Sequence, residues 1–557
     1  MPSGSDIMVE ALKREGVKDA FGIPGGAIMP FYDRLKDSGI RHILMRHEQG
    51  AAHAADGYAR ALGRPGLCIA TSGPGATNLV TGIATAYMDS SPIVALTGQV
   101  PVKLIGRDSF QEIDIVGITN PITKYAFQLK RVSEIPRVVK KAFYIASHGR
   151  PGPVLIDFPK DIQLGEVEHV EYPERVWVSG RGVHLPSPDM KAVGTAAIWL
   201  MEAEKPIMLV GGGVIHSGAS PQVLELAELL NMPVVTTLMG KGAIPENHPL
   251  CLGMIGMHGK LGANTALAEA DLVLAVGTRF SDRSVGPFED LDSNARIIHV
   301  DVDESEIGKN VRCHLPIVAD AKKALEALID AVKTLPPKSR TAWVEKVKEL
   351  RETALESDDG KGIKPWKVMK IMRSVLPRDA IITTGVGQNQ MWAALHFDVY
   401  APRTFITSGG LGTMGFGFPA SIGAKVARPD RTVVCVDGDG SFLMTCQNLA
   451  TAVVQNIPVT VVILDNRSLG MVRQWQELFF NKRFVAVDLG QTPDFEKLAK
   501  AFGAEGVRVG DYEEFREALS KAINSDVPTV IDVPIEPSEK VFPIIPPGGK
   551  VSEAITG

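Results

Sequence analysis

Two polar residues with metal-binding side chains follow two apolar stretches of the sequence. Asp439 stands between two glycines at the end of the stretch 433–438, and Asn466 ends the stretch 459–466. Apolar, β-branched stretches that flank an amphipathic segment are typical of a parallel βαβ unit with buried strands. Ligands bind at the carboxyl ends of the strands in an open parallel sheet. We therefore expect Asp439 and Asn466 to face the same crevice.

The chemistry expected at this crevice is the binding of a cation together with a phosphate. Side-chain oxygens of Asp and Asn suit Mg²⁺, which in proteins often also holds phosphate oxygens. Ser441 is placed to cap the following helix, whose first N–H groups would receive the phosphate. The tripeptide Gly438-Asp439-Gly440 by itself is more simply a tight turn after a strand. The prediction therefore depends on Asn466 and on a glutamate far upstream.

That glutamate and two glycine-rich segments complete the set of candidate site residues. Glu48 lies in the sequence Arg-His-Glu-Gln-Gly-Ala-Ala (46–52), where the simplest interpretation is a helix-start glutamate favoured by the helix dipole. Segment 408–417 is too dense in glycine for an ordinary element, and glycine lets the backbone approach a ligand closely. Segment 210–214, Val-Gly-Gly-Gly-Val, follows a predicted strand. It is weak evidence for a dinucleotide site, and packing explains it equally well.

The composition is that of an ordinary globular protein. Of the 557 residues, 45% are hydrophobic and 22% are charged, and the length suits about three or four domains. The net charge of −5, with no basic block, argues against nucleic acid as a partner. Five scattered cysteines, mostly in apolar stretches, indicate free thiols in a reducing compartment. No secretory signal, Arg-rich presequence or membrane-spanning stretch is recognised, so we expect a cytoplasmic protein without a membrane partner.

Apolar strand patterns alternate with helical patterns along most of the chain. This alternation predicts an α/β protein with three doubly wound parallel-sheet domains, of which the first and third share a pattern of elements. Strands are predicted in the first two domains at 43–45, 67–71, 93–97, 154–158, 206–210, 234–237, 272–276 and 297–300. The predicted boundaries are 1–165 for the first domain, 166–188 for a linker, 189–333 for the middle domain, 334–364 for a second linker, 365–535 for the third domain and 536–557 for a C-terminal tail.

The spacing of Asp439 and Asn466 resembles the thiamin-diphosphate motif of the thiamin-dependent enzymes. Further motifs are similar to the large, catalytic subunit of the acetohydroxyacid synthase (acetolactate synthase) family, and the similarity runs from about residue 21 to residue 548. These motifs are Phe-Gly-Ile-Pro-Gly-Gly-Ala (21–27), Thr-Ser-Gly-Pro-Gly-Ala-Thr-Asn (71–78), Gly-Arg-Pro-Gly-Pro-Val (149–154), Gly-Met-Ile-Gly-Met-His-Gly (253–259), Arg-Phe-Ser-Asp-Arg (279–283), Gly-Met-Val-Arg-Gln-Trp (470–475) and Phe-Pro-Ile-Ile-Pro-Pro-Gly (542–548).

The resemblance implies a pyrimidine-binding first domain, a central FAD-binding domain and a diphosphate-binding third domain with Mg²⁺. Asp439, the Asn466 side chain and the Ser468 carbonyl would bind the metal. The family usually has two Asn at the second position, and here Asp465 takes the place of the first. Glu48 would hydrogen-bond the aminopyrimidine ring of a cofactor held by the other subunit.

Thiamin diphosphate itself would lie on the third domain. By resemblance, the Gly412 carbonyl accepts a hydrogen bond from the pyrimidine amine, and Met414 lies beneath the cofactor and keeps it bent. A methionine in the core is the alternative for Met414. The family commonly has His where Asn389 stands, so this phosphate contact would lack a positive charge. The other implied contacts with thiamin diphosphate are Gly387, Gln388, Met391, Gly438, Gly440, Ser441 and Met471.

In the middle domain the resemblance implies FAD, with no redox part in the main reaction. The implied FAD contacts are Gly211, Gly212, Gly213, Met257, His258, Arg279 and Asp301. Arg283 would hold the carboxylate of the second 2-oxo acid, which suits guanidinium geometry, and Trp475 would line the pocket for its alkyl group. The partner subunit would contribute Gly26, Phe110, Gln111 and Lys160 to the active-site wall. A surface cation is the alternative for Lys160 and Arg283, and a core side chain is the alternative for Trp475.

The function implied is decarboxylation of pyruvate and transfer of the two-carbon unit to a second pyruvate or to 2-oxobutanoate. The products would be 2-acetolactate and 2-aceto-2-hydroxybutyrate, in branched-chain amino acid biosynthesis. The resemblance also implies a homodimer or a dimer of dimers with active sites at the interface, and such chains often partner a separate regulatory subunit. Two alternatives stay open: a pyruvate oxidase that uses the flavin for oxidation, and a non-catalytic nucleotide-binding or assembly protein. The loss of Glu48, Asp439 or Asn466 would favour the second, and all three are present.

Overall fold

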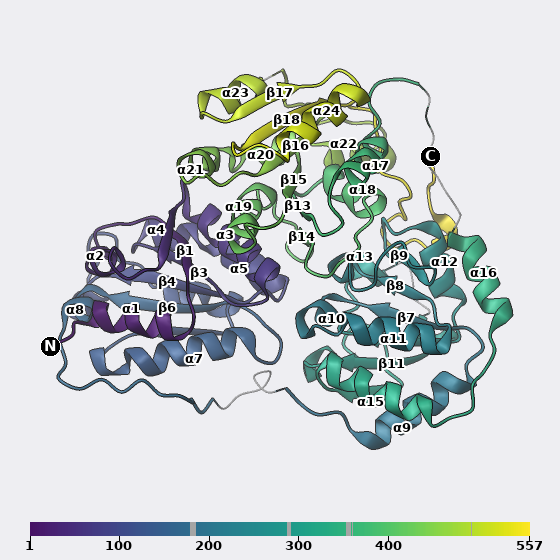
Figure 1. The fold of residues 1–557 in the computed structure, drawn as a ribbon, viewed down its shortest axis with the longest axis horizontal. Helices are drawn as coiled ribbons and strands as arrows, with labels where there is room; N and C mark the ends of the chain where they lie inside the picture. The colour runs from purple at the N-terminus through teal and green to yellow at the C-terminus, as the bar shows by residue number, and fades with distance from the viewer. Residues whose placement is uncertain (179–184, 287–290, 352–357, 359, 492) are drawn as a thin grey trace.

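The computed structural model describes residues 1–178, 185–286, 291–351, 358, 360–491 and 493–557. The chain folds into three α/β domains, each built on a six-stranded sheet of parallel strands (Figure 1). This architecture confirms the predicted fold class. Parts of the two predicted linkers, 179–184 and 352–357 with 359, lie outside the described residues.

The first domain has the strand order β2-β1-β3-β4-β6-β5. Its strands are β1 (Asp19–Gly22), β2 (Arg41–Leu44), β3 (Gly66–Ala70), β4 (Ile93–Gln99), β5 (Tyr125–Gln128) and β6 (Val154–Pro159). Its helices are α1 (Gly4–Arg14), α2 (Met29–Leu35), α3 (Glu48–Leu62), α4 (Pro74–Asn78), α5 (Val80–Met88), α6 (Ile115–Thr119), α7 (Ile135–Ser147) and α8 (Lys160–Leu164). Strands β3, β4 and β6 are buried along their whole length, as expected for parallel strands covered on both faces.

The third domain repeats this strand order as β14-β13-β15-β16-β18-β17, which confirms the shared pattern expected from the sequence. Its strands are β13 (Ile381–Thr384), β14 (Phe405–Thr407), β15 (Val433–Gly438), β16 (Thr460–Asp465), β17 (Glu505–Arg508) and β18 (Thr529–Pro534). Its helices are α17 (Pro365–Val375), α18 (Gln388–His396), α19 (Gly417–Ala427), α20 (Asp439–Leu443), α21 (Leu449–Val454), α22 (Gly470–Phe479), α23 (Phe495–Ala501) and α24 (Tyr512–Ala522).

The middle domain has a different order, β12-β11-β10-β7-β8-β9. Its strands are β7 (Pro206–Val210), β8 (Val234–Thr236), β9 (Cys251–Met254), β10 (Leu272–Val276), β11 (Arg296–Asp301) and β12 (Leu315–Val318). Its helices are α9 (Met190–Glu202), α10 (Gly212–Ser217), α11 (Ser220–Leu230), α12 (Leu261–Glu269), α13 (Asp282–Val285), α14 (Leu291–Asn294), α15 (Ala321–Lys333) and α16 (Thr341–Arg351). Numbered within the domain, this is the order 3-2-1-4-5-6 of dinucleotide-binding sheets, in which the ligand crevice opens where the order reverses, here between β7 and β10.

Helix α16 packs on the middle domain although it lies in the predicted linker 334–364. Trp343 is only 4% exposed, and its indole N–H donates to the Pro206 carbonyl at 3.0 Å. Val347, one turn further along, is also buried. The indole therefore fixes this helix to the start of β7, and the segment adds to the core of the middle domain.

The first and third domains are joined by close packing of α3 on α19 (Figure 1). A Cβ atom added to Gly57 would lie 2.1 Å from the Ala420 carbonyl oxygen, and one added to Gly423 would lie 1.8 Å from the Ala54 carbonyl oxygen. The two helices thus touch backbone to backbone, which only glycine permits.

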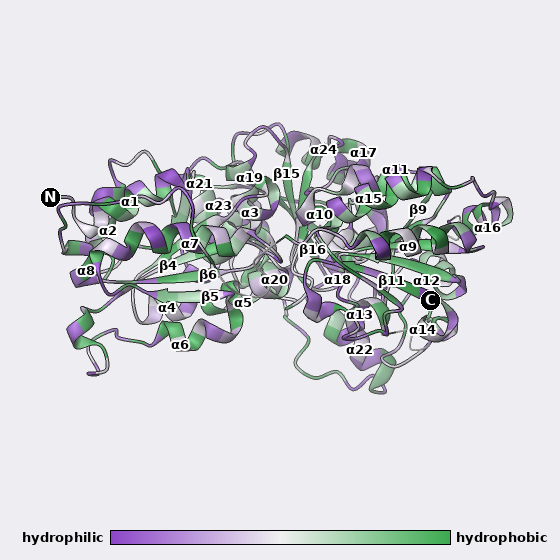
Figure 2. Ribbon diagram, turned by 90° about the horizontal axis from the view of Figure 1, so that it is seen from below, coloured by the Kyte–Doolittle hydropathy of each residue, from purple (hydrophilic) through white to green (hydrophobic). Residues whose placement is uncertain are grey.

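Hydrophobic residues concentrate on the strands of the three sheets (Figure 2). All five cysteines carry free thiols, as predicted. Among the described residues, no helix is both long and apolar enough to cross a membrane.

Candidate active site

The carboxyl edge of the third sheet brings the three predicted metal ligands together. Strands β15 and β16 are neighbours, with Gly438 paired to Leu464, so Asp439 and Asn466 follow the ends of adjacent strands. Both side chains are buried. The Asn466 Oδ1 accepts the Ser468 N–H at 3.0 Å, which places the Ser468 backbone beside it.

The electrostatics of this edge favour a cation. Burial and the neighbouring Asp465 carboxylate raise the pKa of Asp439 to about 7. A divalent cation would stabilise the ionised carboxylate against both effects. Within the described part of the chain, no three His, Cys, Asp or Glu side chains gather in metal-binding geometry. The predicted donor set of one carboxylate, one amide and one backbone carbonyl is not of that kind, and these oxygen ligands fit Mg²⁺.

Ser441 does not cap a helix, so that prediction is wrong. Helix α20 begins at Asp439, with Gly438 at the N-cap position and no side-chain cap. Because the chain passes from β15 into the helix without a loop, Ser441 is already the third helical residue. Its hydroxyl accepts the Gly415 N–H at 3.0 Å and so supports the glycine-rich segment 408–417.

The glycine-rich segment and the turn before α18 lie over the same edge. Gly412 has a φ of +70°, in the left-handed region that favours glycine. A Cβ atom added to Gly440 would lie 3.6 Å from the Met414 Cε, so Met414 reaches the start of α20. The Asn389 side chain donates to the Val436 carbonyl at 3.1 Å, which ties the first turn of α18 to β15.

A cavity of about 850 Å³ extends between the middle and third domains, and first-domain residues such as Asp89 and Arg150 also line it. Its lining includes the predicted contacts Gly387, Met391, Gly412 and Met471 from the third domain, and Gly212, Gly213, Met257, His258, Arg279 and Asp301 from the middle domain. Gly211 is not part of the lining, because it packs on the Gly277 carbonyl, which a Cβ atom would approach to 2.2 Å. The cavity thus opens at the ends of β7 and β10, where the strand order reverses.

The two predicted substrate residues meet in this cavity from different domains. Arg283 follows β10 in the middle domain, and Trp475 lies on α22 of the third domain. The Arg283 Cζ atom is 5.4 Å from the centre of the Trp475 ring. A guanidinium beside an indole can hold a carboxylate while the ring contacts an alkyl group.

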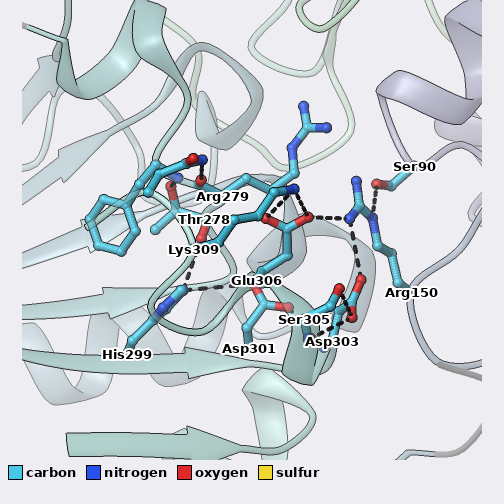
Figure 3. Close-up of polar contacts among 12 residues, drawn as sticks. Ser90, Arg150, Thr278, Arg279, His299, Asp301, Asp303, Ser305, Glu306 and Lys309 are labelled. Carbon is cyan, nitrogen blue, oxygen red and sulfur yellow. Dashed lines mark hydrogen bonds and ion pairs between the residues drawn. The ribbon is translucent and has the colours of Figure 1, made fainter. Parts of the chain in front are cut away.

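The middle-domain end of the cavity carries a network of charged side chains (Figure 3). Arg150, which comes from the first domain, donates to the Ser90 hydroxyl at 2.9 Å, to Asp303 at 3.3 Å and to Glu306 at 2.7 Å. Arg279 lies beside this network, and among the described residues no hydrogen bond or ion pair to its guanidinium is found. Burial lowers the pKa of Arg279, and a buried cation without a partner suits an anionic ligand.

Glu48 and Gln111 lie together on the first domain, away from this cavity. A Cβ atom added to Gly75 would lie 3.2 Å from the Glu48 Oε1, and one added to Gly73 would lie 2.9 Å from the Gln111 Cα. Glu48 is the first residue of α3, is 8% exposed and accepts a hydrogen bond from Asn78 at 3.0 Å. Neither Glu48 nor Gln111 lines the cavity.

The other residues predicted for the first-domain wall also lie outside the cavity lining. Phe110 is 88% exposed, although it is a large apolar side chain. Gly26 is exposed as well, and Lys160 begins α8 directly after β6 in a half-buried position. One chain therefore holds two separate groups of predicted site residues.

Three family models match the chain. They are described as Thiamine pyrophosphate enzyme, with an N-terminal TPP binding domain at residues 2–118, a central domain at 193–328 and a C-terminal TPP binding domain at 385–533. The two matches described as binding thiamine pyrophosphate (thiamin diphosphate) fall on the two domains with the same strand order.

Relatives align with nearly the whole chain. "Probable acetolactate synthase large subunit" of Methanocaldococcus jannaschii is 52% identical over 99% of this chain and 95% of its own length. "Acetolactate synthase isozyme 2 large subunit" of Escherichia coli K12 is 45% identical over 99% of both chains. "Acetolactate synthase 2, chloroplastic" of Nicotiana tabacum is 45% identical over 99% of this chain and 85% of its own length.

The chain belongs to the acetolactate synthase large-subunit family. It is therefore a thiamin diphosphate-dependent enzyme of this kind. Relatives whose names contain the words acetolactate synthase come from archaea, bacteria and plants.

Several residues that line the cavity were not predicted from the sequence. Arg150 lies in the motif 149–154, which was recognised without a role being assigned to this residue. Glu306 and Asp320 also line the cavity but belong to none of the recognised motifs. Their positions follow from the fold of the middle domain, because both lie near the carboxyl ends of its strands β11 and β12.

Asp439→Ala is expected to abolish Mg²⁺-dependent binding of thiamin diphosphate, because the metal loses its carboxylate ligand. Cofactor titration with and without Mg²⁺ measures this effect. Asp430→Ala is the matched control, since Asp430 is exposed and precedes the opposite end of the same strand, β15. If Asp439→Ala binds the cofactor as tightly as the parent, and still in a Mg²⁺-dependent way, Asp439 is only a turn residue.

Proposed function

We propose that the chain decarboxylates pyruvate and joins the two-carbon unit to a second pyruvate, giving 2-acetolactate, or to 2-oxobutanoate, giving 2-aceto-2-hydroxybutyrate. The observation that carries this proposal is the meeting of Arg283 and Trp475 in the cavity that Gly412 and Met471 also line. An acceptor acid held there would lie next to the cofactor site. This activity serves branched-chain amino acid biosynthesis.

The third domain supplies the cofactor site in this proposal. Asp439, Asn466 and the Ser468 carbonyl bind Mg²⁺, and the backbone at Gly387 and Gly438 approaches the diphosphate. Thiamin diphosphate, when bound, supplies the electron sink that decarboxylation needs. The protein supports it by burying the charged edge and by holding the Gly412 carbonyl in a fixed position.

Glu48 acts on the aminopyrimidine ring in this proposal. Its carboxyl group would hydrogen-bond a nitrogen of this ring and would thereby support the proton transfers that activate the cofactor. Burial at the first position of α3 and the Asn78 hydrogen bond hold the carboxyl group in one orientation. The first-domain site residues line no part of the cavity in their own chain, which supports a contribution from the partner subunit. These residues are Glu48, Gln111, Phe110, Gly26 and Lys160.

The separation of the predicted site residues into two groups supports a homodimer with active sites at the interface. The exposed Phe110 ring would then be covered by the partner, as would Gly26 and Lys160. A dimer of dimers and a cytoplasmic location stay predictions. A regulatory subunit is a further proposed partner, which the words "large subunit" in the names of relatives support.

FAD is proposed to bind in the middle-domain end of the cavity without a redox role. Three features support this: the strand order of the middle sheet, the position of the cavity at the reversal of that order, and the Arg279 guanidinium, to which the described residues supply no hydrogen bond or ion pair. Arg279 would pair with the FAD diphosphate, and the Asp301 carboxyl group lies in the same lining.

Arg279→Gln is expected to weaken FAD binding by about 10- to 150-fold, because a charge-assisted pairing with the diphosphate is lost. Titration of flavin-free protein, followed by flavin fluorescence, measures the dissociation constant. Arg296→Gln is the control, since Arg296 lies in the same domain but is half-exposed and pairs with Glu202. Unchanged affinity in Arg279→Gln would remove the assignment, and reduction of bound FAD by pyruvate alone would favour a pyruvate oxidase.

Trp475→Leu is expected to reduce the preference for 2-oxobutanoate over pyruvate as acceptor, because the indole contacts the additional methylene. Shaped pockets discriminate one methylene by about 10- to 200-fold, so a fall of about 10-fold is expected. Competition between the two acids at a fixed ratio, with both products quantified, measures the preference.

Arg283→Ala provides the contrast for this measurement. The carboxylate is common to both acceptors, so both products should fall together and their ratio should change little. A parental product ratio in Trp475→Leu would make the indole a packing residue. Parent protein that forms neither product, from pyruvate alone or from pyruvate with 2-oxobutanoate, in the presence of thiamin diphosphate, Mg²⁺ and FAD would contradict the proposed function.

A further inference from the structure

The three domains meet at the turn that follows α5, at Asp89 and Ser90. The Asp89 carboxylate is buried and accepts two backbone N–H groups of the third domain, from Gly410 at 2.6 Å and from Gly409 at 3.2 Å. Ser90 has a φ of +56°. Its hydroxyl accepts a hydrogen bond from Arg150, which also donates to Asp303 and Glu306 of the middle domain (Figure 3). One short turn of the first domain therefore contacts both parts of the cavity.

Asp89 is part of a buried ion network. The Arg60 guanidinium lies 3.0 Å from Asp89 and 2.6 Å from Asp56, and it also donates to the Thr407 carbonyl at 2.7 Å. Burial raises the pKa of Asp89, and the ion pair with Arg60 opposes this. The two N–H donors from Gly409 and Gly410 satisfy the lone pairs that face the third domain, as a buried carboxylate requires.

The segment bound by Asp89 is the one that leads to Gly412 and Met414. It is confined on both sides: a Cβ atom added to Gly410 would lie 2.7 Å from the Met88 carbonyl oxygen, and one added to Gly409 would lie 2.5 Å from the Met239 Sδ. Met239 belongs to the short helix η4 (Leu238–Gly240) of the middle domain.

Thr85 makes a second contact with the same segment from the first domain. Its hydroxyl lies 2.7 Å from the Thr413 hydroxyl, between the two residues assigned to the cofactor, Gly412 and Met414. Helix α5 and the turn that follows it thus hold the segment at two points, one on each side of Gly412.

We propose that Asp89 and Thr85 are positioning residues, which set the place of Gly412 and Met414 and thereby the geometry of bound thiamin diphosphate. The inference rests on the proposed function, because the roles of Gly412 and Met414 toward the cofactor do. Neither Asp89 nor Thr85 needs to touch the cofactor. Their effect passes through the backbone of residues 409–413, which belongs to another domain of the same chain.

A purely stabilising role for the buried ion network is the competing explanation, and Asp56 separates the two. Asp56 is buried and pairs with Arg60 as Asp89 does, but among the described residues its side-chain hydrogen bonds go only to Arg60 within α3. Asp56→Asn is therefore the matched control for Asp89→Asn. Both variants remove one carboxylate from the network, and only Asp89→Asn weakens the link to Gly409 and Gly410.

Two measurements test the proposal. The first is amide hydrogen exchange of the peptide covering residues 407–414 in protein without cofactor. In Asp89→Asn this exchange should be about 10-fold faster or more, because two amides lose their charged acceptor. The second is hydrogen–deuterium exchange at the thiazolium carbon of thiamin diphosphate, at saturating cofactor and Mg²⁺, which should be about 10- to 100-fold slower in Asp89→Asn.

The control sets the scale for both measurements. Even at an equal loss of melting temperature, both exchange rates in Asp56→Asn should stay within about threefold of the parent. Parental rates in Asp89→Asn, or equal changes in the two variants, would overturn the positioning role.

A second variant keeps the test valid if Asp89→Asn does not fold. Thr85→Val preserves the shape of the side chain and removes the contact with Thr413 together with a hydrogen bond to the Thr81 carbonyl within α5, so its cofactor exchange should be about 3- to 10-fold slower than in the parent. Parental exchange in Thr85→Val would then overturn the proposal. Parent protein that does not bind thiamin diphosphate would contradict the proposed function instead, while the amide measurement would still decide whether Asp89 orders the segment.

Discussion

The close packing of α3 on α19 is the constraint on which the rest of the structure depends. Gly57 and Gly423 bring the two helix backbones into contact, and any larger residue would force them apart. Helix α3 begins at Glu48 and carries Arg60 in its last turn, so this packing fixes both the carboxyl group at one end and the ion network at the other. Glu48 lines no part of the cavity of its own chain, and this separation is what supports the proposed contribution of a partner subunit to the active site.

Charge then distinguishes the places of the two cofactors. Asp439 is a buried carboxylate whose pKa is raised by burial and by Asp465, so it is stabilised by a cation. Arg279 is a largely buried guanidinium to which the described residues supply no hydrogen bond or ion pair, so it is stabilised by an anion. The strand orders agree with this proposed assignment, because the middle sheet has the order of dinucleotide-binding sheets and the first and third sheets share a different order.

The sequence predicted the buried parts of this fold better than its edges. Strands such as β4 and β7 were recognised because every residue is buried and the sequence is continuously apolar. The edge strands β5 and β12 were missed, since their partly exposed residues give no such signal. The capping role of Ser441 was wrong because the sequence does not reveal that β15 passes into α20 without a loop. Roles such as that of Gly412 came from resemblance, and no spacing would have linked Arg150 to Glu306, which lie in different domains.

The account requires that each active site combine Glu48 from one subunit with Asp439 from the other, and subunit complementation tests this most directly. The variants Glu48→Gln and Asp439→Ala should each be inactive alone. Mixed in equal amounts, with dissociation and reassociation, they should recover about a quarter of the parental activity, because about half of the dimers are mixed and each of these has one intact site. Activity no greater than the sum of the two separate variants would contradict the account, because both groups would then belong to one chain's site.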